Sequence, residues 1–164
     1  MTVERIFVRQ SSVEPQTERE RVEVVAGAGI KGDRYFDRHD EPGQNITLIE
    51  AEEIESFLTE YQRPRDLSIS YRNIVTRGVR LNDLIGREFM IGEVRLRGVE
   101  LCEPCLSLGK ALASPELTAA QVVKRFLHRA GLRADVLSGG SLACGAKITT
   151  AASQEAPPKC SICT

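Results

Sequence analysis

The sequence predicts a mainly β domain in which short strands form a barrel and a few α-helices lie at its periphery. Short apolar segments rich in valine, isoleucine and leucine recur along the chain, and several alternate with polar residues as half-buried strands do. Glycine-containing turns separate these segments, and only two stretches have the apolar spacing of a helix. Many short strands with few helices are typical of barrel-like β domains.

Strands are expected where the apolar pattern has a period of two or is β-branched. They are residues 3–8, 22–25, 45–49, 69–76, 88–91, 94–99, 134–137 and 142–149. The pair at 88–91 and 94–99 should form a hairpin, because Gly92 and Glu93 between them suit a tight turn. Residues 9–20 are polar and are expected to form a loop.

Helices are expected at residues 50–61 and 115–129. The first carries apolar residues at helical spacing and acidic residues in its first turn, where they complement the helix dipole. The second begins after Ser114, a plausible cap, with Pro115 in the first turn. Residues 80–85 are expected to form one further helical turn.

Length and charge limit the classes of function. A chain of 164 residues fits one domain, expected at 1–150, followed by a flexible cysteine-containing tail at 151–164. The formal net charge of −1 provides no general attraction to nucleic acid or to an anionic membrane. Any anion-binding site must therefore be local.

The cellular compartment is expected to be the cytoplasm. No run of about 18 apolar residues is present that could span a membrane. The N-terminus lacks the basic-then-apolar pattern of a signal peptide. Thiols are kept reduced in the cytoplasm, and the odd number of cysteines, five, also argues against a disulfide framework. The cysteines are better considered as reactive groups or metal ligands.

Cys102 and Cys105 form a C-x-x-C pair around Glu103 and Pro104. Such a pair can chelate a metal, form a redox disulfide, or contain one reactive cysteine and one inert one. The structural alternative is two small buried residues at the end of a strand.

The remaining cysteines carry weaker signals. Cys160 and Cys163 form a second C-x-x-C pair, so a four-cysteine zinc site is a further alternative. The long folded stretch before this pair and its place in the tail argue against that site. Cys144 is expected in the core.

Several basic and polar residues could bind an anion locally. The glycine-rich segment 29–34 lacks the spacing of a nucleotide phosphate loop but can offer cationic side chains. Arginine matches phosphate geometry well, although a single arginine is more often a solvated surface charge. The candidates are Lys31, Arg34, Arg72, Asn73, Arg129 and Arg133. Neither histidine lies in an H-E-x-x-H motif, and no G-x-S-x-G is present, which argues against those two hydrolase classes.

Taken in order, these segments resemble the MOSC domain, a family named for the C-terminal part of molybdenum cofactor sulfurase. The matching segments are 29–34, 45–50, 72–75, 84–86, 91–94, 100–105 and 128–134. The resemblance runs from about residue 1 to residue 148. Their number and order make it specific.

The resemblance implies a β-barrel with peripheral helices and one functional cysteine, at the position of Cys105. In relatives that bind the molybdenum cofactor, this thiolate ligates the metal, and some relatives reduce N-hydroxylated compounds with electrons from separate proteins. It thus implies Cys105 as metal ligand and catalytic residue, the molybdenum cofactor (molybdopterin), a small-molecule substrate, and an electron-donor or sulfur-donor protein. The candidate basic residues could hold the phosphate of the pterin, and Asn73 could hydrogen-bond its ring.

Three hypotheses remain at this point. The chain is a molybdenum-dependent oxidoreductase, or a module that delivers cofactor or carries sulfur as a Cys105 persulfide, or a zinc or redox protein that uses its C-x-x-C pairs.

Overall fold

The computed structural model describes residues 1–150, and it confirms the mainly β fold. The strands are β1 Thr2–Val8, β2 Thr17–Arg19, β3 Arg21–Val25, β4 Gly29–Ile30, β5 Ile46–Glu50, β6 Ile74–Arg77, β7 Glu88–Ile91, β8 Val94–Leu101, β9 Leu132–Val136, β10 Gly140–Ala143 and β11 Ile148–Thr150. The helices are α1 Ala51–Glu60, α2 Leu106–Leu112 and α3 Ala119–Phe126, with 3-10 turns η1 Leu67–Ser70 and η2 Leu81–Leu84.

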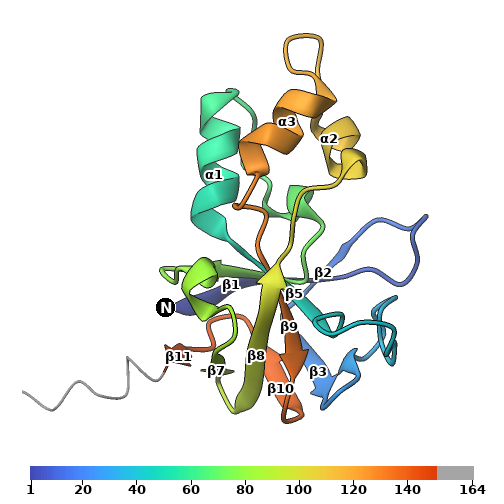
Figure 1. Ribbon diagram of the computed structural model, residues 1–164, viewed down its shortest axis with the longest axis vertical. Helices are drawn as coiled ribbons and strands as arrows, with labels where there is room; N and C mark the ends of the chain where they lie inside the picture. Colours follow the sequence, from blue (N-terminus) through green and yellow to red (C-terminus); the bar gives the residue numbers. More distant parts are fainter. Residues whose placement is uncertain (151–164) are drawn as a thin grey trace, which may run out of the picture.

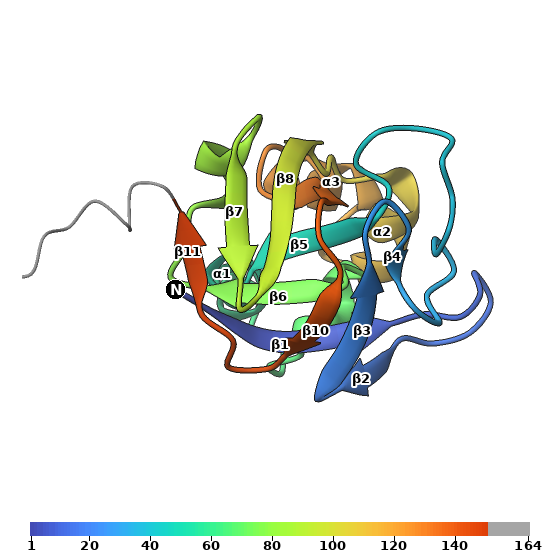
Figure 2. The same cartoon turned by 90° about the horizontal axis from the view of Figure 1, so that it is seen from below.

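The strands form two sheets that together make a curled, half-barrel wall. The larger sheet has eight strands in the order β11-β7-β8-β9-β5-β6-β1-β2, and the smaller has the order β10-β3-β4. The β5–β6 pair is parallel, whereas its neighbours in the larger sheet pair antiparallel. Backbone hydrogen bonds help to close the curl, since Gly145 N–H donates to Val3 O at 2.9 Å and Val3 N–H donates to Ala146 O at 2.9 Å. In Figure 2, β10 and β3 of the smaller sheet lie next to β1 of the larger sheet.

Two apolar cores hold this arrangement together. One fills the inside of the curl, where Leu48, Leu96 and Leu132 are fully buried. The other lies between the sheet and the helices, which gather at one end of the strands (Figure 1). There the rings of Phe57 and Phe126 meet with centroids 5.0 Å apart. The second core fixes the helices against the sheet end where the pocket described below opens.

The expected strand at 69–76 is only partly correct. The chain forms the 3-10 turn η1 to Ser70, and β6 begins at Ile74. Asp66 caps the turn by accepting a hydrogen bond from Ser68 N at 2.9 Å, and Tyr71 ends it with a left-handed backbone, φ 57°. Side-chain capping of this kind competes with extended structure, which the β-branched pattern alone does not reveal.

The helix expected at 115–129 is shorter than predicted and corresponds to α3. An additional helix, α2, precedes it. α3 starts after Thr118, which with Gln121 forms a capping box, and Ser114 is not its cap. α2 was not expected, because it is short and contains Gly109. That glycine lets the two helices pack closely, since a Cβ there would lie 2.6 Å from Ala119 O.

Two other segments differ in detail from the prediction. The expected loop at 9–20 contains the short strand β2, which pairs with β1. The expected strand at 142–149 is divided into β10, which pairs with β3, and β11, which pairs with β7. Cys144, expected in the core, lies between them and is partly buried against the inner core. Within residues 1–150, no helix is long and apolar enough to cross a membrane.

Candidate functional site

The cysteine segment connects the end of β8 to the start of α2. Cys102 N–H donates to Gly131 O at 2.8 Å, which ties the segment to the turn before β9. Cys105 is the N-terminal cap residue of α2 and has an extended backbone. The two cysteines therefore come from different local structures, one from the continuation of a strand and the other from a helix start.

Gly131 makes this attachment possible. Its φ is +105°, and a Cβ at this position would lie 1.9 Å from Leu48 O. Only glycine allows the turn to approach β5 so closely. The carbonyl groups of Ala130 and Gly131 then point to Arg72 and Cys102, respectively.

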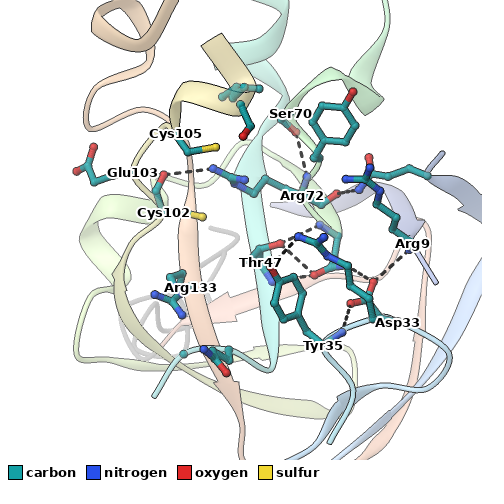
Figure 3. Close-up of a pocket in the computed structure, with 18 of the residues that line it drawn as sticks. Arg9, Asp33, Tyr35, Thr47, Ser70, Arg72, Cys102, Glu103, Cys105 and Arg133 are labelled. Atoms are coloured by element: carbon teal, nitrogen blue, oxygen red, sulfur yellow. Dashed lines mark hydrogen bonds between the residues drawn. The ribbon is translucent and has the colours of Figure 1, made fainter. Parts of the chain in front are cut away.

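A pocket of about 860 Å³ opens beside the cysteine segment (Figure 3). Of the residues predicted from the sequence, it is lined by Arg34, Arg72, Asn73, Cys105 and Arg133. The fold thus brings together residues from four distant segments of the chain. Cys102 also lines it, and its role was not predicted.

Lys31 and Arg129 are not among the residues that line this pocket. Lys31 Nζ pairs with Glu23 Oε1 at 2.7 Å on β3, and Arg129 Nη1 lies 3.6 Å from Glu53 Oε2 on α1. Each of these two cations pairs with a carboxylate that does not line the pocket. Both residues lie in segments that resemble the family, 29–34 and 128–134. The sequence alone does not show that their side chains point away from the pocket.

Cys105 is the exposed member of the pair, and its thiolate is favoured. Partial burial acts to raise its pKa, but this is outweighed by the Leu108 and Ser107 backbone N–H groups and by the charge of Arg72, so that the pKa lies below the ordinary cysteine value. The Cys105 side chain makes no capping hydrogen bond at the start of α2, although both amides lie near the sulfur. Cys105 is therefore the better nucleophile and metal ligand of the two.

Cys102 has the opposite character. Desolvation by burial raises its pKa, although the charges of Arg72 and Arg133 oppose this effect. It is less accessible than Cys105. At neutral pH it remains a thiol, which separates the roles of the two cysteines.

Arg72 joins the cysteine segment to its surroundings. Its Nε donates to Ala130 O at 2.9 Å, and its Nη2 lies 3.5 Å from Cys102 O. Figure 3 shows its side chain extending toward the cysteines from the middle of the pocket. One guanidinium thus both supports the local backbone and favours the Cys105 thiolate.

The arginines of the pocket differ in how their charge is balanced. Arg133 is paired with Glu100 at 2.7 Å and with Glu41 at 3.5 Å. Within the described part of the chain, by contrast, Arg9, Arg34 and Arg72 form no ion pair with a carboxylate. The pocket therefore has a local positive charge that an anionic ligand can balance, although the chain as a whole is nearly neutral.

Asn73 serves the structure of the pocket wall. Its Oδ1 accepts from Thr47 N and Thr47 Oγ1 at 3.1 and 3.0 Å, and its Nδ2 donates to Phe7 O at 3.2 Å and Asp33 Oδ1 at 3.0 Å. Because these bonds use its amide oxygen and both amide hydrogens, the side chain is occupied. The proposed contact with a pterin ring would require breaking one of them.

Several residues of the site were not predicted from the sequence. Arg9, Tyr35 and Tyr71 line the pocket, and Gln16 and Gln44 each place a buried side-chain oxygen there that has no hydrogen-bond partner within residues 1–150. None of these belongs to a motif with a known spacing.

The sequence does not predict the contact that Glu103 makes with His128. Glu103 accepts from His128 Nδ1 at 2.9 Å and from His128 N at 3.3 Å, and His128 has a left-handed backbone, φ 60°. This contact fastens the middle of the C-x-x-C segment to the turn after α3.

No group of three or more histidine, cysteine or acidic side chains within residues 1–150 is arranged to hold a metal ion. Cys160 and Cys163, and with them the four-cysteine alternative, lie outside the described residues.

Comparison with known structures supports the fold. YuaD from Bacillus subtilis matches with a TM-score of 0.76 at 20% identity, over 90% of this chain and 94% of YuaD. YiiM from Geobacillus stearothermophilus matches with a TM-score of 0.67 at 18% identity, over 91% of this chain and 74% of YiiM. YiiM from Escherichia coli matches with a TM-score of 0.64 at 14% identity, over 92% of this chain and 69% of YiiM.

The sequence itself carries the family assignment. A search of curated proteins gives no match. Residues 36–149, however, match the MOSC domain and include the cysteine segment and most of the pocket wall. The chain therefore belongs to the MOSC domain family.

Proposed function

We propose that this protein binds the molybdenum cofactor with the Cys105 thiolate as metal ligand and reduces N-hydroxylated compounds. One observation carries the proposal. An exposed cysteine with a lowered pKa opens into the same pocket as Arg72, whose guanidinium forms no ion pair with a carboxylate of residues 1–150. A soft thiolate beside uncompensated positive charge suits a cofactor that combines a transition metal with an anionic group.

The residues present fit such a cofactor in size and polarity. The pocket volume of about 860 Å³ lies within the range common for cofactor sites. Gln16 and Gln44 contribute amide oxygens without partners, which can accept hydrogen bonds from the N–H groups of a pterin. Arg72, which acts on both cysteines, is the residue we assign to the phosphate or to the metal end of the cofactor.

Each side chain then has a definite task. Cys105 would hold the metal, Arg72 helps to lower the pKa of that thiol, and Glu103 with His128 fixes the segment that carries it. When bound, the cofactor supplies two-electron redox chemistry. The open side of the pocket gives a small-molecule substrate access to it. Electrons would come from a separate donor protein, as the family resemblance implies.

A second candidate function rests on the same thiolate. An accessible low-pKa cysteine is also a competent sulfur nucleophile, so a Cys105 persulfide could carry sulfur for a partner protein. This reading needs the reactive cysteine but does not need the anion-binding part of the pocket.

Composition and turnover of the purified protein distinguish these functions. We expect the full chain, produced in a host that makes the cofactor, to contain molybdenum and pterin and to reduce benzamidoxime with reduced methyl viologen. Molybdenum without turnover would indicate a delivery module. Sulfur released by cyanide as thiocyanate, without molybdenum, would indicate a sulfur carrier. Zinc in place of molybdenum would overturn the proposal.

A further inference from the structure

Two arginine–tyrosine stacks form a part of the pocket that the cysteine chemistry does not use. The Arg34 guanidinium lies over the Tyr35 ring at 4.4 Å from its centroid, and Arg9 lies over the Tyr71 ring at 5.1 Å. Both stacks line the pocket, and both tyrosines are exposed, at 39% and 44%. In Figure 3, Arg9 and Tyr35 lie across the pocket from Cys102 and Cys105.

Asp33 joins the two stacks into one rigid unit. Its Oδ1 accepts from Arg9 N at 3.2 Å, and its Oδ2 accepts from Tyr35 N at 3.0 Å. Asn73 holds the same carboxylate through its Nδ2 at 3.0 Å, and Arg34 N–H donates to Arg9 O at 2.8 Å. The guanidinium of Arg9 is further oriented by Glu14 O and Ser12 O at 2.7 and 2.5 Å. The stacks are therefore preorganised.

The backbone of Tyr71 is strained in this arrangement. Its φ of 57° places a bulky aromatic residue in the left-handed region, where such residues are rare and strained. Asparagine or glycine would adopt this backbone more easily. Strain retained at an exposed ring on a pocket wall is typical of a binding site.

We propose that the two stacks bind a planar aromatic anion, so that the substrate of the proposed reductase is an N-hydroxylated aromatic compound with a negatively charged substituent. Guanidinium and phenol faces stack on flat rings. Neither the Arg9 nor the Arg34 guanidinium forms an ion pair with a carboxylate within residues 1–150, because the nearby Asp33 carboxylate accepts from two backbone N–H groups and from Asn73. Arg9 and Tyr35 lie away from Cys102 and Cys105 in Figure 3, which sets this subsite apart from the metal end of the pocket. The reduction of the N-hydroxyl group rests on the proposed function, whereas the binding of a planar aromatic anion to the two stacks does not.

Binding to the full chain as purified tests the subsite separately. Benzoate and cyclohexanecarboxylate carry the same charge, but only benzoate is flat, and benzamide is flat but neutral. By NMR titration, benzoate should bind about tenfold more tightly than either of the other two, given the usual strength of such stacking. Equal affinity for benzoate and cyclohexanecarboxylate would overturn the proposal.

Variants at Tyr71 separate binding from stability. Tyr71→Asn should lower benzoate affinity about tenfold while the melting temperature stays the same or rises by about 3 °C, because strain is relieved. Tyr71→Phe should bind benzoate like the parent. Gln62→Asn, at another left-handed residue, φ 49° at the end of α1, should leave affinity unchanged. Unchanged benzoate affinity in Tyr71→Asn, or a large fall in its melting temperature, would contradict the inference.

Benzoate affinity measured with and without bound molybdenum distinguishes the aromatic-anion subsite from the proposed function. Benzoate affinity should persist in protein that contains molybdenum. Loss of affinity on loading would mean that the stacks hold the cofactor itself, and the substrate subsite would be refuted while the proposed function stood. Benzoate selectivity in protein that never takes up molybdenum would refute the proposed function alone.

Discussion

The difference between Cys102 and Cys105 arises from their immediate surroundings. Cys102 continues a strand and is desolvated, whereas Cys105 lies at a helix start with amide groups and Arg72 nearby. The sequence indicated that the pair was important, and the family resemblance selected the second cysteine. The physical reason for that choice, unequal burial, depends on tertiary packing and could not be predicted from the spacing.

The pH dependence of alkylation tests this difference. Because the pKa of Cys105 is lowered, its thiolate persists to lower pH than that of an ordinary cysteine, and iodoacetamide should modify it before Cys102 as the pH is raised. Arg72→Gln removes a positive charge that favours the thiolate and should move the Cys105 profile to higher pH. Arg97→Gln, at an exposed pair with Glu88, is the matched control. Peptide mass spectrometry resolves the two sites, and identical profiles for both cysteines would contradict this view.

Asn73 is expected to matter through stability. Asn73→Ala removes the partners of Thr47, Phe7 and Asp33 and should lower the free energy of unfolding by roughly 2–4 kcal/mol. Asn82→Ala, which removes one exposed bond to His128 O, should cost less than about 1 kcal/mol. Urea denaturation gives both values. A stable Asn73→Ala protein that fails to bind pterin would instead support the direct contact that the sequence suggested.

At the scale of elements, apolar periodicity predicted most strands and the first helix, because a half-buried strand or a helix face must show its period in the sequence. It failed where side chains redirect the backbone. Asp66 and the left-handed Tyr71 end an apparently β-branched segment early. The short helix α2, which places Cys105, has too few turns to show a period and contains Gly109 for close packing.

The turn at Gly131 provides an element-level prediction. Gly131→Ala would place a Cβ against Leu48 O, so the turn must withdraw from β5, and we expect a loss of more than about 3 kcal/mol of unfolding free energy. Gly27→Ala, also at positive φ but with open space around it, should cost about 1 kcal/mol. Thermal or urea unfolding compares the two. Equal costs would show that backbone strain alone, without the close approach, determines the effect.

At the scale of the molecule, the pocket gathers residues from the loop after β1, the glycine-rich segment, the end of η1 and the β8–α2 connection. The order of short motifs was enough to predict the family and the barrel. It was not enough to predict which cations converge, since Lys31 and Arg129 pair with acids elsewhere while Arg9 enters the pocket. Convergence of this kind depends on sheet register and on the direction of each side chain, which a local pattern does not encode.

The most direct test of the central claim is the molybdenum content per chain of Cys105→Ser compared with Cys102→Ser, both purified from a host that makes the cofactor. Each substitution replaces one sulfur by oxygen in the segment that joins β8 to α2, so any general effect on the structure of that segment should be similar in both variants. We predict that Cys105→Ser loses nearly all molybdenum, while Cys102→Ser keeps most of it, because Cys105 is the one of these two cysteines that is exposed and has a lowered pKa. Equal retention in the two variants would contradict the assignment of Cys105 as the metal ligand.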